Sequence, residues 1–263
     1  RVEGVTNGHG DLMSALEGGI FHARINFDSV RVNDVKLPDG LFESTWDFQR
    51  ERARFALSAR ENGDTTLQGF YNPADGRYLA EVRMRNVDMS LLDPMLEGVI
   101  SNTTGKATVA AQVTGQRRAL KVNGSVGVKD LSTNIDFLNV RYGLPSATIA
   151  VKDNVMTLDG VSLRDPQGNG APFDMKVDLS SLSNVRYDFN IRPANMLVLN
   201  TTEKDNQLFY GRVFATGAAN IRGDKAGVAM DIKATTARNS EFYLPLSDAS
   251  TMGVSDIITF VTP

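Results

Sequence analysis

The chain has 263 residues, with 28 Lys and Arg against 31 Asp and Glu, which gives a formal net charge of −3. A charge this close to neutral excludes the basic footprint of a nucleic-acid-binding protein, and a hydrophobic content of 41% is too high for a disordered chain. The sequence has no cysteine, which excludes disulfides, thiolate metal sites and a cysteine nucleophile. No apolar run reaches the about 18 residues of a membrane-spanning helix.

Apolar and polar residues alternate along most of the chain with the period of two that is typical of β-strands with one dry face. The segments with this pattern are Phe21–Phe27, Phe42–Phe48, Ala53–Ala59, Tyr78–Met84, Ala107–Val113, Leu120–Val128, Phe173–Leu179, Val185–Ile191, Phe209–Ile221 and Val228–Ala234. The sequence therefore predicts an all-β protein with over half of its residues in strands. We expect the segment before the first of these strands, Arg1–Asp11, to be a loop.

Short runs of turn-forming residues separate the strands. They are Asn72–Gly76, Asp153–Asn154, Asp165–Gly170 and Arg222–Lys225. A succession of hairpins predicts an antiparallel meander with one wet and one dry face. One helix is predicted over Met89–Ile100, where apolar residues recur at helical spacing and Pro94 suits a first helical position. A second short helix is predicted over Met252–Val261.

Small residues occupy the apolar positions of two similar strands. Gly105–Gly115 and Gly211–Gly223 are each bounded by glycine, alternate in the same way and are followed by a turn and another strand. A closed core needs bulky side chains at such positions, whereas glycine and alanine leave depth above the sheet for another molecule or allow a tight bend.

The dry face is the one feature of the sequence that indicates a function, because a large exposed apolar surface binds lipid, membrane or apolar polypeptide. Alternation alone leaves open whether this face is an open groove or closes on itself as the core of a sandwich or barrel. The residues expected to line a groove are Ala107, Val109, Ala111, Val113, Val122, Val126, Phe173, Met175, Val177, Tyr187, Phe189, Ile191, Val213, Ala215, Ala219, Ile221, Val228, Met230 and Ile232.

Catalytic and metal sites find no support in the sequence. The chain has two histidines, and the pattern puts His22 on the wet face of a strand. Ser125 lies inside a strand and lacks the glycine two residues before it that a nucleophile elbow needs. Asp165–Gly170 has too few carboxylates for a calcium loop and is predicted to be a hairpin turn. We therefore expect a protein that is not an enzyme and that binds no cofactor or metal.

Several phrases in the sequence resemble the TamB family of the translocation and assembly module, within the AsmA-like superfamily. The resemblance covers residues 67–246, while residues 1–66 match only weakly. Its most specific stretch is Asn195–Gly211, and the phrases that precede it in order are Leu67–Asn72, Leu91–Ile100, Val113–Gly115, Val128–Asp130, Tyr142 and Leu163–Asn169. Ala171–Met175 departs from the family, which has a glycine-containing strand there.

This resemblance implies a long curved sheet, folded like a taco or half-pipe, with an apolar inner face. It implies a periplasmic location in a Gram-negative envelope, within a protein anchored in the inner membrane. The implied partners are phospholipid and an outer-membrane barrel of the TamA type, and the implied roles are phospholipid transport and assistance to outer-membrane protein assembly. The alternative is a structural, adhesin-like module with a sealed core. Residues 1–263 are expected to be one continuous β module and a fragment of a longer protein, with residues 247–263 beginning the next element.

Overall fold

The computed structural model describes residues 2–13, 19–32, 35–36, 39–59, 65–117, 119–181 and 183–245. They form one sheet of 17 strands and a 3-10 helix. The strands are β1 (Val2–Met13), β2 (Ile20–Val32), β3 (Val35–Lys36), β4 (Gly40–Asp47), β5 (Arg52–Ala59), β6 (Thr65–Asn72), β7 (Arg77–Asp88), β8 (Ile100–Gln116), β9 (Ala119–Ile135), β10 (Val140–Lys152), β11 (Val155–Arg164), β12 (Gly170–Asp178), β13 (Arg186–Ile191), β14 (Met196–Thr201), β15 (Tyr210–Asp224), β16 (Gly227–Thr236) and β17 (Glu241–Tyr243). The predicted all-β fold is confirmed.

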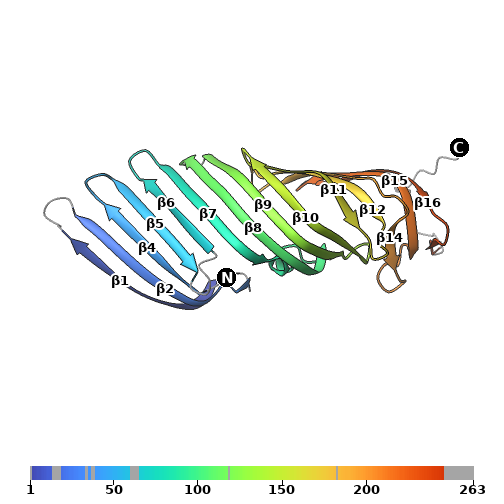
Figure 1. Cartoon of the computed structure of the whole chain (residues 1–263), viewed down its shortest axis with the longest axis horizontal. Coiled ribbons are helices and arrows are strands. Elements are labelled where there is room, and N and C mark those ends of the chain that lie inside the picture. Colours follow the sequence, from blue (N-terminus) through green and yellow to red (C-terminus); the bar gives the residue numbers. More distant parts are fainter. Residues whose placement is uncertain are drawn as a thin grey trace, which may run out of the picture.

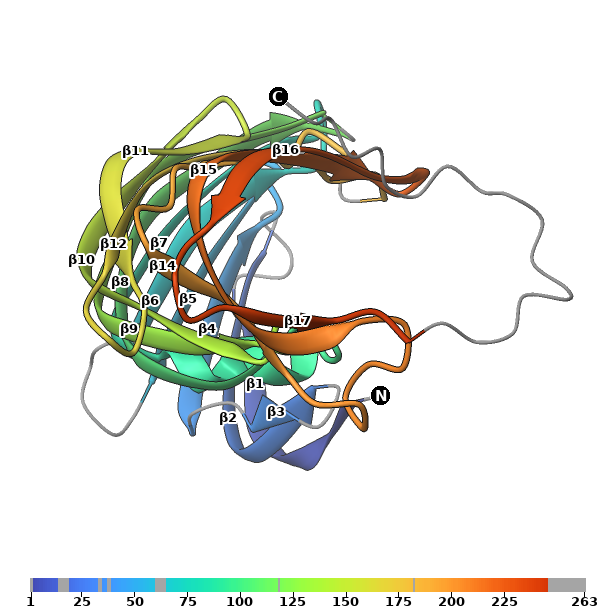
Figure 2. The same ribbon diagram turned by 90° about the vertical axis from the view of Figure 1, so that its right-hand side faces the viewer.

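Every pairing in the sheet is antiparallel, and nearly every strand pairs with the next one along the chain (Figure 1). The exceptions are β2, which pairs with both β3 and β4, and β15, which pairs with β13 and β14 on one side and with β16 and β17 on the other. Among the described residues β1 pairs with β2 alone and β16 with β15 alone, so the sheet stays open. Viewed along its length, it curls into an open C (Figure 2).

A row of backbone irregularities crosses the middle of the sheet from β7 to β11. Asn86, Gly105, Asp130 and Gly160 have φ angles of 54°, 117°, 52° and 68°, and register shifts accompany them in the β7–β8, β8–β9 and β11–β12 pairings. A bulge bends its strand and increases the local twist. Because the bulges lie within a few residues of one another in neighbouring strands, they bend the sheet along a common line, which we call the crease.

The predicted helix over Met89–Ile100 is wrong in type and length. The structure has a 3-10 helix, η2 (Met89–Met95), and strand β8 begins at Ile100. Pro94 lies inside η2, not at its start, and Gly98 adopts a φ of 77°, which ends helical geometry. The Asp93 carboxylate also accepts a hydrogen bond from the Thr103 N–H. This bond joins η2 to β8 and is part of the geometry that replaces a longer helix. The helix predicted over Met252–Val261 lies outside the described residues.

The expectation of a loop over Arg1–Asp11 is also wrong, because β1 occupies most of this segment. The alternation is concealed by Gly8 and Gly10, which have no side chain on the apolar face. Side chains from β2 take their place: a Cβ added to Gly8 would meet Ile25 Cγ1 at 3.0 Å, and one added to Gly10 would meet Phe21 Cζ at 2.8 Å. A strand that is covered by its neighbour's side chains shows no hydrophobic period of its own.

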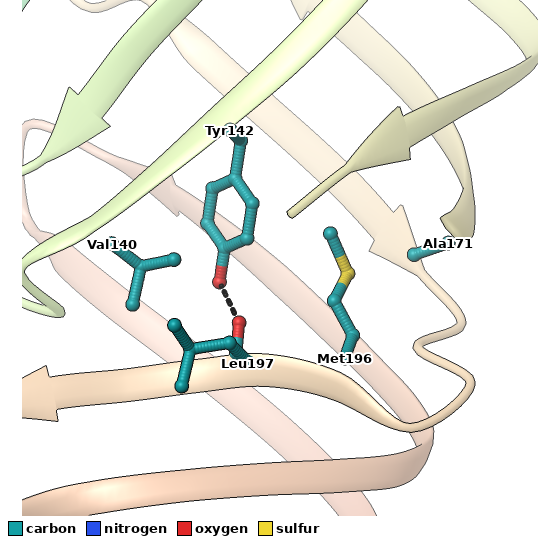
Figure 3. Close-up of a cluster of buried hydrophobic side chains, with 5 residues drawn as sticks. All are labelled: Val140, Tyr142, Ala171, Met196 and Leu197. Carbon is teal, nitrogen blue, oxygen red and sulfur yellow. Dashed lines mark hydrogen bonds between the residues drawn. The ribbon is translucent and has the colours of Figure 1, made fainter. Parts of the chain in front are cut away.

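The most deeply buried side chains lie together where β14 packs against the ends of β10 and β12 (Figure 3). This cluster comprises Val140, Tyr142, Ala171, Met196 and Leu197. The Tyr142 hydroxyl donates a hydrogen bond to the Leu197 carbonyl oxygen at 2.9 Å. Burial, and then the nearby charge of Asp165, raise the pKa of Tyr142 far above its usual value, so this donor keeps its proton at any physiological pH.

Asp165 ties the β11–β12 turn to β14. Its carboxylate accepts hydrogen bonds from the backbone N–H groups of Gln167, Asn169 and Leu197 at 2.8–2.9 Å and from the Asn169 side chain. Asp165–Gly170 is therefore the hairpin turn that the sequence predicted. Burial alone would raise the pKa of Asp165, but the hydrogen bonds, that of Leu197 first, outweigh it and hold the pKa below its usual value.

Replacing Asp165 with alanine is expected to lower the free energy of unfolding by roughly 3 kcal/mol, because the buried Leu197 N–H loses its acceptor. Asp159→Ala, at an exposed position of the preceding strand β11, is the control and should change little. A depressed carboxyl pKa stabilises the fold above the unfolded-state pKa of about 3.9, and this contribution disappears as the pH falls through the folded-state pKa. Chemical denaturation should therefore show the gap between wild type and Asp165→Ala closing below about pH 4. Equal stability at pH 7 would contradict this role.

Candidate functional site

The pairing register places the predicted groove residues on one face of the sheet, because directly paired residues in an antiparallel ladder share a face. Val113 pairs with Val122 and Val109 with Val126 across β8 and β9. In the C-terminal half, the paired residues include Met175–Phe189, Phe173–Ile191, Val177–Tyr187, Phe189–Ile221, Ile191–Ala219, Ala219–Ile232, Ile221–Met230 and Met196–Ala215. The ladder between these halves continues through β10 and β11, since Ile149 pairs with Val126, Val151 with Met156 and Met156 with Val177. Within β10 the buried side switches at the exposed pair Pro145–Ser146, from Val140, Tyr142 and Leu144 to Ala147, Ile149 and Val151.

The same ladder extends through the N-terminal strands, which were not among the predicted groove residues. Val82 pairs with Ala111 on one side and with Leu67 on the other, and the face continues to β2 through Leu57, Phe42 and Ile25. The paired residues named here, from Ile25 in β2 to Ile232 in β16, are all uncharged. The alternation of these strands in the sequence could have identified their residues as part of the same face.

This apolar face is the concave one. In β8 the side chains of Val109, Ala111 and Val113 are half-buried, whereas the intervening Ala110 and Gln112 are exposed. No second layer of described residues covers either face at β8, since its contacts are with its neighbouring strands and with η2. In a curved sheet without a covering layer, side chains on the inner side crowd together and those on the outer side spread apart. The alternation between half-buried and exposed side chains therefore indicates that the sheet is curved and that its apolar face is on the inner side. We call this concave apolar face the trough.

The predicted groove residues differ in how much surface they offer to a ligand. Ala107, Val213 and Ala215 are 4%, 7% and 5% exposed, so they pack beneath their neighbours and support the trough without lining it. Val228, Met230 and Ile232, on the edge strand β16, are 56–59% exposed. The other predicted residues are half-buried. The accessible part of the trough is thus widest at its β16 end and in the half-buried rows of β8–β13.

Aromatic rings lie against glycines on the trough face of the sheet. Phe55 covers its direct partner Gly69, and the pairs Phe27–Gly40, Tyr78–Gly115 and Tyr187–Gly223 repeat the arrangement. In each pair a Cβ added to the glycine would collide with the ring. A ring that packs over a glycine shields the backbone from water, and it lies close to the sheet because glycine has no side chain there. Space above the sheet therefore remains in the trough. Of the glycines that the sequence showed in the two similar strands, Gly115 and Gly223 therefore accommodate aromatic side chains, whereas Gly105, Gly211 and Gly217 are approached by backbone atoms of the neighbouring strand.

Replacing Gly69 with valine is expected to lower the free energy of unfolding by roughly 1–3 kcal/mol, as overpacking does. A Cβ at this position would lie 2.8 Å from Phe55 Cζ and would also collide with the Leu79 carbonyl oxygen. The matched control is Gly143→Val, because an added Cβ there meets nothing closer than 3.9 Å. Thermal melts of the two variants should differ, and equal midpoints would show that the ring does not depend on the glycine.

The total surface area shows how open the molecule is. The chain exposes 17747 Å², whereas a compact monomer of 28.6 kDa exposes roughly 11,000 Å². Successive strands lie about 4.8 Å apart, so the ladder from β1 to β16 extends for roughly 60 Å. The hydrocarbon core of one leaflet is about 15 Å thick, and the trough is therefore long enough for several acyl chains in a row.

The described part of the chain has few residues arranged as a catalytic or metal-binding site would require. His22 lies on the polar face and contacts Thr45 through its Nδ1 at 3.1 Å. No group of three His, Cys, Asp or Glu side chains there has a metal-binding arrangement. No helix within the described ranges has the length and hydropathy of a membrane span. Comparisons of the chain with protein-family models, with curated proteins and with solved structures find no match.

Proposed function

We propose that the chain is a non-enzymatic module that holds phospholipid acyl chains in its trough and conducts them between the inner and outer membranes of a Gram-negative envelope. The observation that supports this most is the row of uncharged paired residues on the concave face, which continues through β2, β4–β13, β15 and β16. The resemblance of residues 67–246 to the TamB family supports the periplasmic setting and the phospholipid class. The trough supplies the physical basis for such a role.

The energetics favour an apolar occupant over water. Removing apolar surface from water stabilises by roughly 25 cal/mol per Å², or about 0.8 kcal/mol for each buried methylene group. An acyl chain that lies along half-buried valine and alanine rows buries its own methylenes and those of the wall. A phosphate headgroup would stay at the open side of the C, because burying a charge without a partner costs several kcal/mol.

The sealed-core alternative has little support in the described residues. A structural module with a dry core needs a second layer or a closed barrel, and here the sheet is open with β1 and β16 unpaired with each other. Fourteen apolar residues of the described part of the chain are buried, and five of them form the cluster around Met196. Such a molecule exposes apolar surface that a purely structural module has no reason to retain.

A role in outer-membrane protein assembly is a second candidate, and the free edge of β16 favours it. Among the described residues β16 pairs only with β15, and its apolar side chains are exposed. An unpaired edge with exposed apolar residues is a template for strand addition by another polypeptide. We propose a barrel of the TamA type, or a client strand, as the partner at this edge. Crosslinking from an exposed position of β16 would identify it.

A phospholipid with a nitroxide on its acyl chain tests the lipid proposal. The methyl groups of Val109 and Val113 face the trough, and the Ala110 methyl lies between them on the outer face. Paramagnetic broadening should be strong for the two valines and weak for Ala110 in methyl-labelled protein. Equal broadening of all three, or none at saturating lipid, would contradict acyl-chain binding in the trough.

A further inference from the structure

The outer, polar face of the sheet has a hollow beside the crease that the trough does not explain. Its volume is about 610 Å³, and four of its ten lining residues are Asn86 and the apolar Val128, Pro145 and Ala147. The other six are Lys106, Thr108, Gly127, Lys129, Ser146 and Thr148. These residues come from the three adjacent strands β8, β9 and β10. None of the described residues that line the hollow is acidic. The hollow is thus a basic and hydroxyl-rich surface on the opposite side of the sheet from the lipid path.

The register arranges this lining in two rows across the three strands. In one row Lys129 pairs with Lys106 on one side and with Ser146 on the other. In the next row Gly127 pairs with Thr108 and with Thr148. Two hydroxyl-bearing residues therefore flank a position without a side chain, and two ammonium groups and a third hydroxyl lie one row away.

Neither packing nor backbone geometry requires glycine at position 127. A Cβ added there would meet nothing closer than the Thr108 carbonyl oxygen at 3.9 Å, and its φ is not among the positive values of the chain. By contrast, Gly69 and Gly115 are covered by aromatic rings. A β-branched residue at position 127 would also have a higher strand propensity than glycine. The effect of Gly127 is to leave the hollow empty.

The residues that line the hollow carry two positive charges and no negative charge. Lys106 and Lys129 are directly opposite each other, an arrangement in which like charges repel. Lys106 Nζ lies 2.8 Å from Asp88 Oδ2, and its hydrogen bond, followed by that of Ser90, lowers the pKa of Asp88 to about 2. Within the described residues Lys129 has no ion-pair partner. An anion between the two lysines would relieve their repulsion.

We propose that this hollow binds a phosphate group, which sits over Gly127. Lys129 and Lys106 supply charge, and the hydroxyls of Thr108, Thr148 and Ser146 donate hydrogen bonds to the phosphate oxygens. Charge-assisted hydrogen bonds of this kind are roughly twice as strong as neutral ones. The phosphate belongs either to a free oxyanion or to the headgroup of an anionic phospholipid, and the hollow has the chemistry for both. Because it lies on the outer face, this site is independent of acyl-chain binding in the trough.

Amide chemical shifts and vesicle flotation test the site with two probes. Inorganic phosphate is titrated while the amides of residues 108, 127 and 148 are followed, and vesicles of phosphatidylglycerol or of phosphatidylcholine alone are floated with the protein. Gly127→Val should fill the hollow, and Lys129→Gln should remove its unpaired charge. Each is expected to weaken binding about tenfold with an unchanged thermal midpoint. The controls are Gly143→Val, where a Cβ is equally free, and Lys233→Gln, an exposed lysine of β16.

Saturable shifts with inorganic phosphate that both variants weaken would assign the site to a free oxyanion. Flotation with phosphatidylglycerol but not phosphatidylcholine, lost in both variants and without a response to inorganic phosphate, would assign it to a lipid headgroup. Binding that Gly127→Val leaves unchanged, or that Gly143→Val and Lys233→Gln weaken equally, would overturn the proposal. The same holds if neither probe binds.

Discussion

Replacing Met230 with aspartate is expected to abolish acyl-chain binding at the β16 end of the trough while the protein stays folded. Met230 is 59% exposed on the edge strand, so the new carboxylate reaches water and costs the fold little. An acyl chain along this strand would have to desolvate the charge, at a cost of several kcal/mol. Binding of a nitroxide-labelled phospholipid at this strand should fall at least about tenfold, with a thermal midpoint within about 2 °C of wild type.

Lys233→Asp is the control for Met230→Asp. Lys233 lies on the same strand and is exposed, but it pairs with Ala218 on the outer face. It therefore introduces an aspartate of equal exposure away from the trough. If both variants lose lipid binding equally, the effect is one of net charge and the trough is not the lipid path. If Met230→Asp binds lipid as wild type does, the β16 end takes no part in it.

The second large effect is expected at Met196, which lies on the same face but is completely buried. Met196 begins β14, is 0% exposed and lies within the buried cluster (Figure 3). Its register partner is Ala215 of β15. An aspartate here would be buried without a cationic partner among the described residues of the cluster. The expected loss is about 5 kcal/mol or more of the free energy of unfolding, which is enough to unfold a protein of ordinary stability.

Met196→Leu conserves volume and should cost less than about 1.5 kcal/mol. Circular dichroism of the two variants separates a packing effect from a general intolerance of substitution at this position. A cooperative, wild-type-like melt of Met196→Asp would show that the cluster around Tyr142 and Met196 is not a core. Opposite outcomes at Met196 and Met230 would distinguish the buried support of the trough from its accessible lining.

The alternation of the sequence was sufficient to predict ten of the strands, an antiparallel arrangement and the side chains that share a face, but it did not identify β1, β10, β11 or β14. Phe173, Met175 and Val177 share a face with Tyr187 and Phe189, as the period of two required. A one-residue slip would have reversed this facing, so the agreement is informative. Alternation is a property of the strand itself and needs no knowledge of what covers it.

The curvature of the sheet could not be predicted in this way. Asn86 and Asp130 adopt positive φ inside long strands, where a sequence pattern gives no sign of a bulge. The crease depends on bulges in different strands meeting in register, which is a property of the whole sheet. The hollow beside the crease was missed for the same reason, because Gly127 and Lys106 are brought together only by the pairing of β8 with β9.

The exposed fraction of individual side chains in the trough could not be predicted from the sequence either. Ala215 and Met230 occupy equivalent apolar positions of neighbouring strands, yet one is 5% exposed and the other 59%. The difference arises because β14 packs on one side of β15 while β16 has no further neighbour among the described residues. Which apolar residues line a groove and which support it is decided by tertiary packing, not by hydrophobic period.

The central claim is that acyl chains lie against the concave face of the sheet. Photo-crosslinking at two adjacent positions of β8 tests it most directly, since Val113 faces the trough and Gln112 the outer side. A benzophenone amino acid at position 113 should crosslink to phospholipid in the intact envelope, and one at position 112 should not. Lipid adducts of equal yield at both positions, or at position 112 alone, would contradict the account.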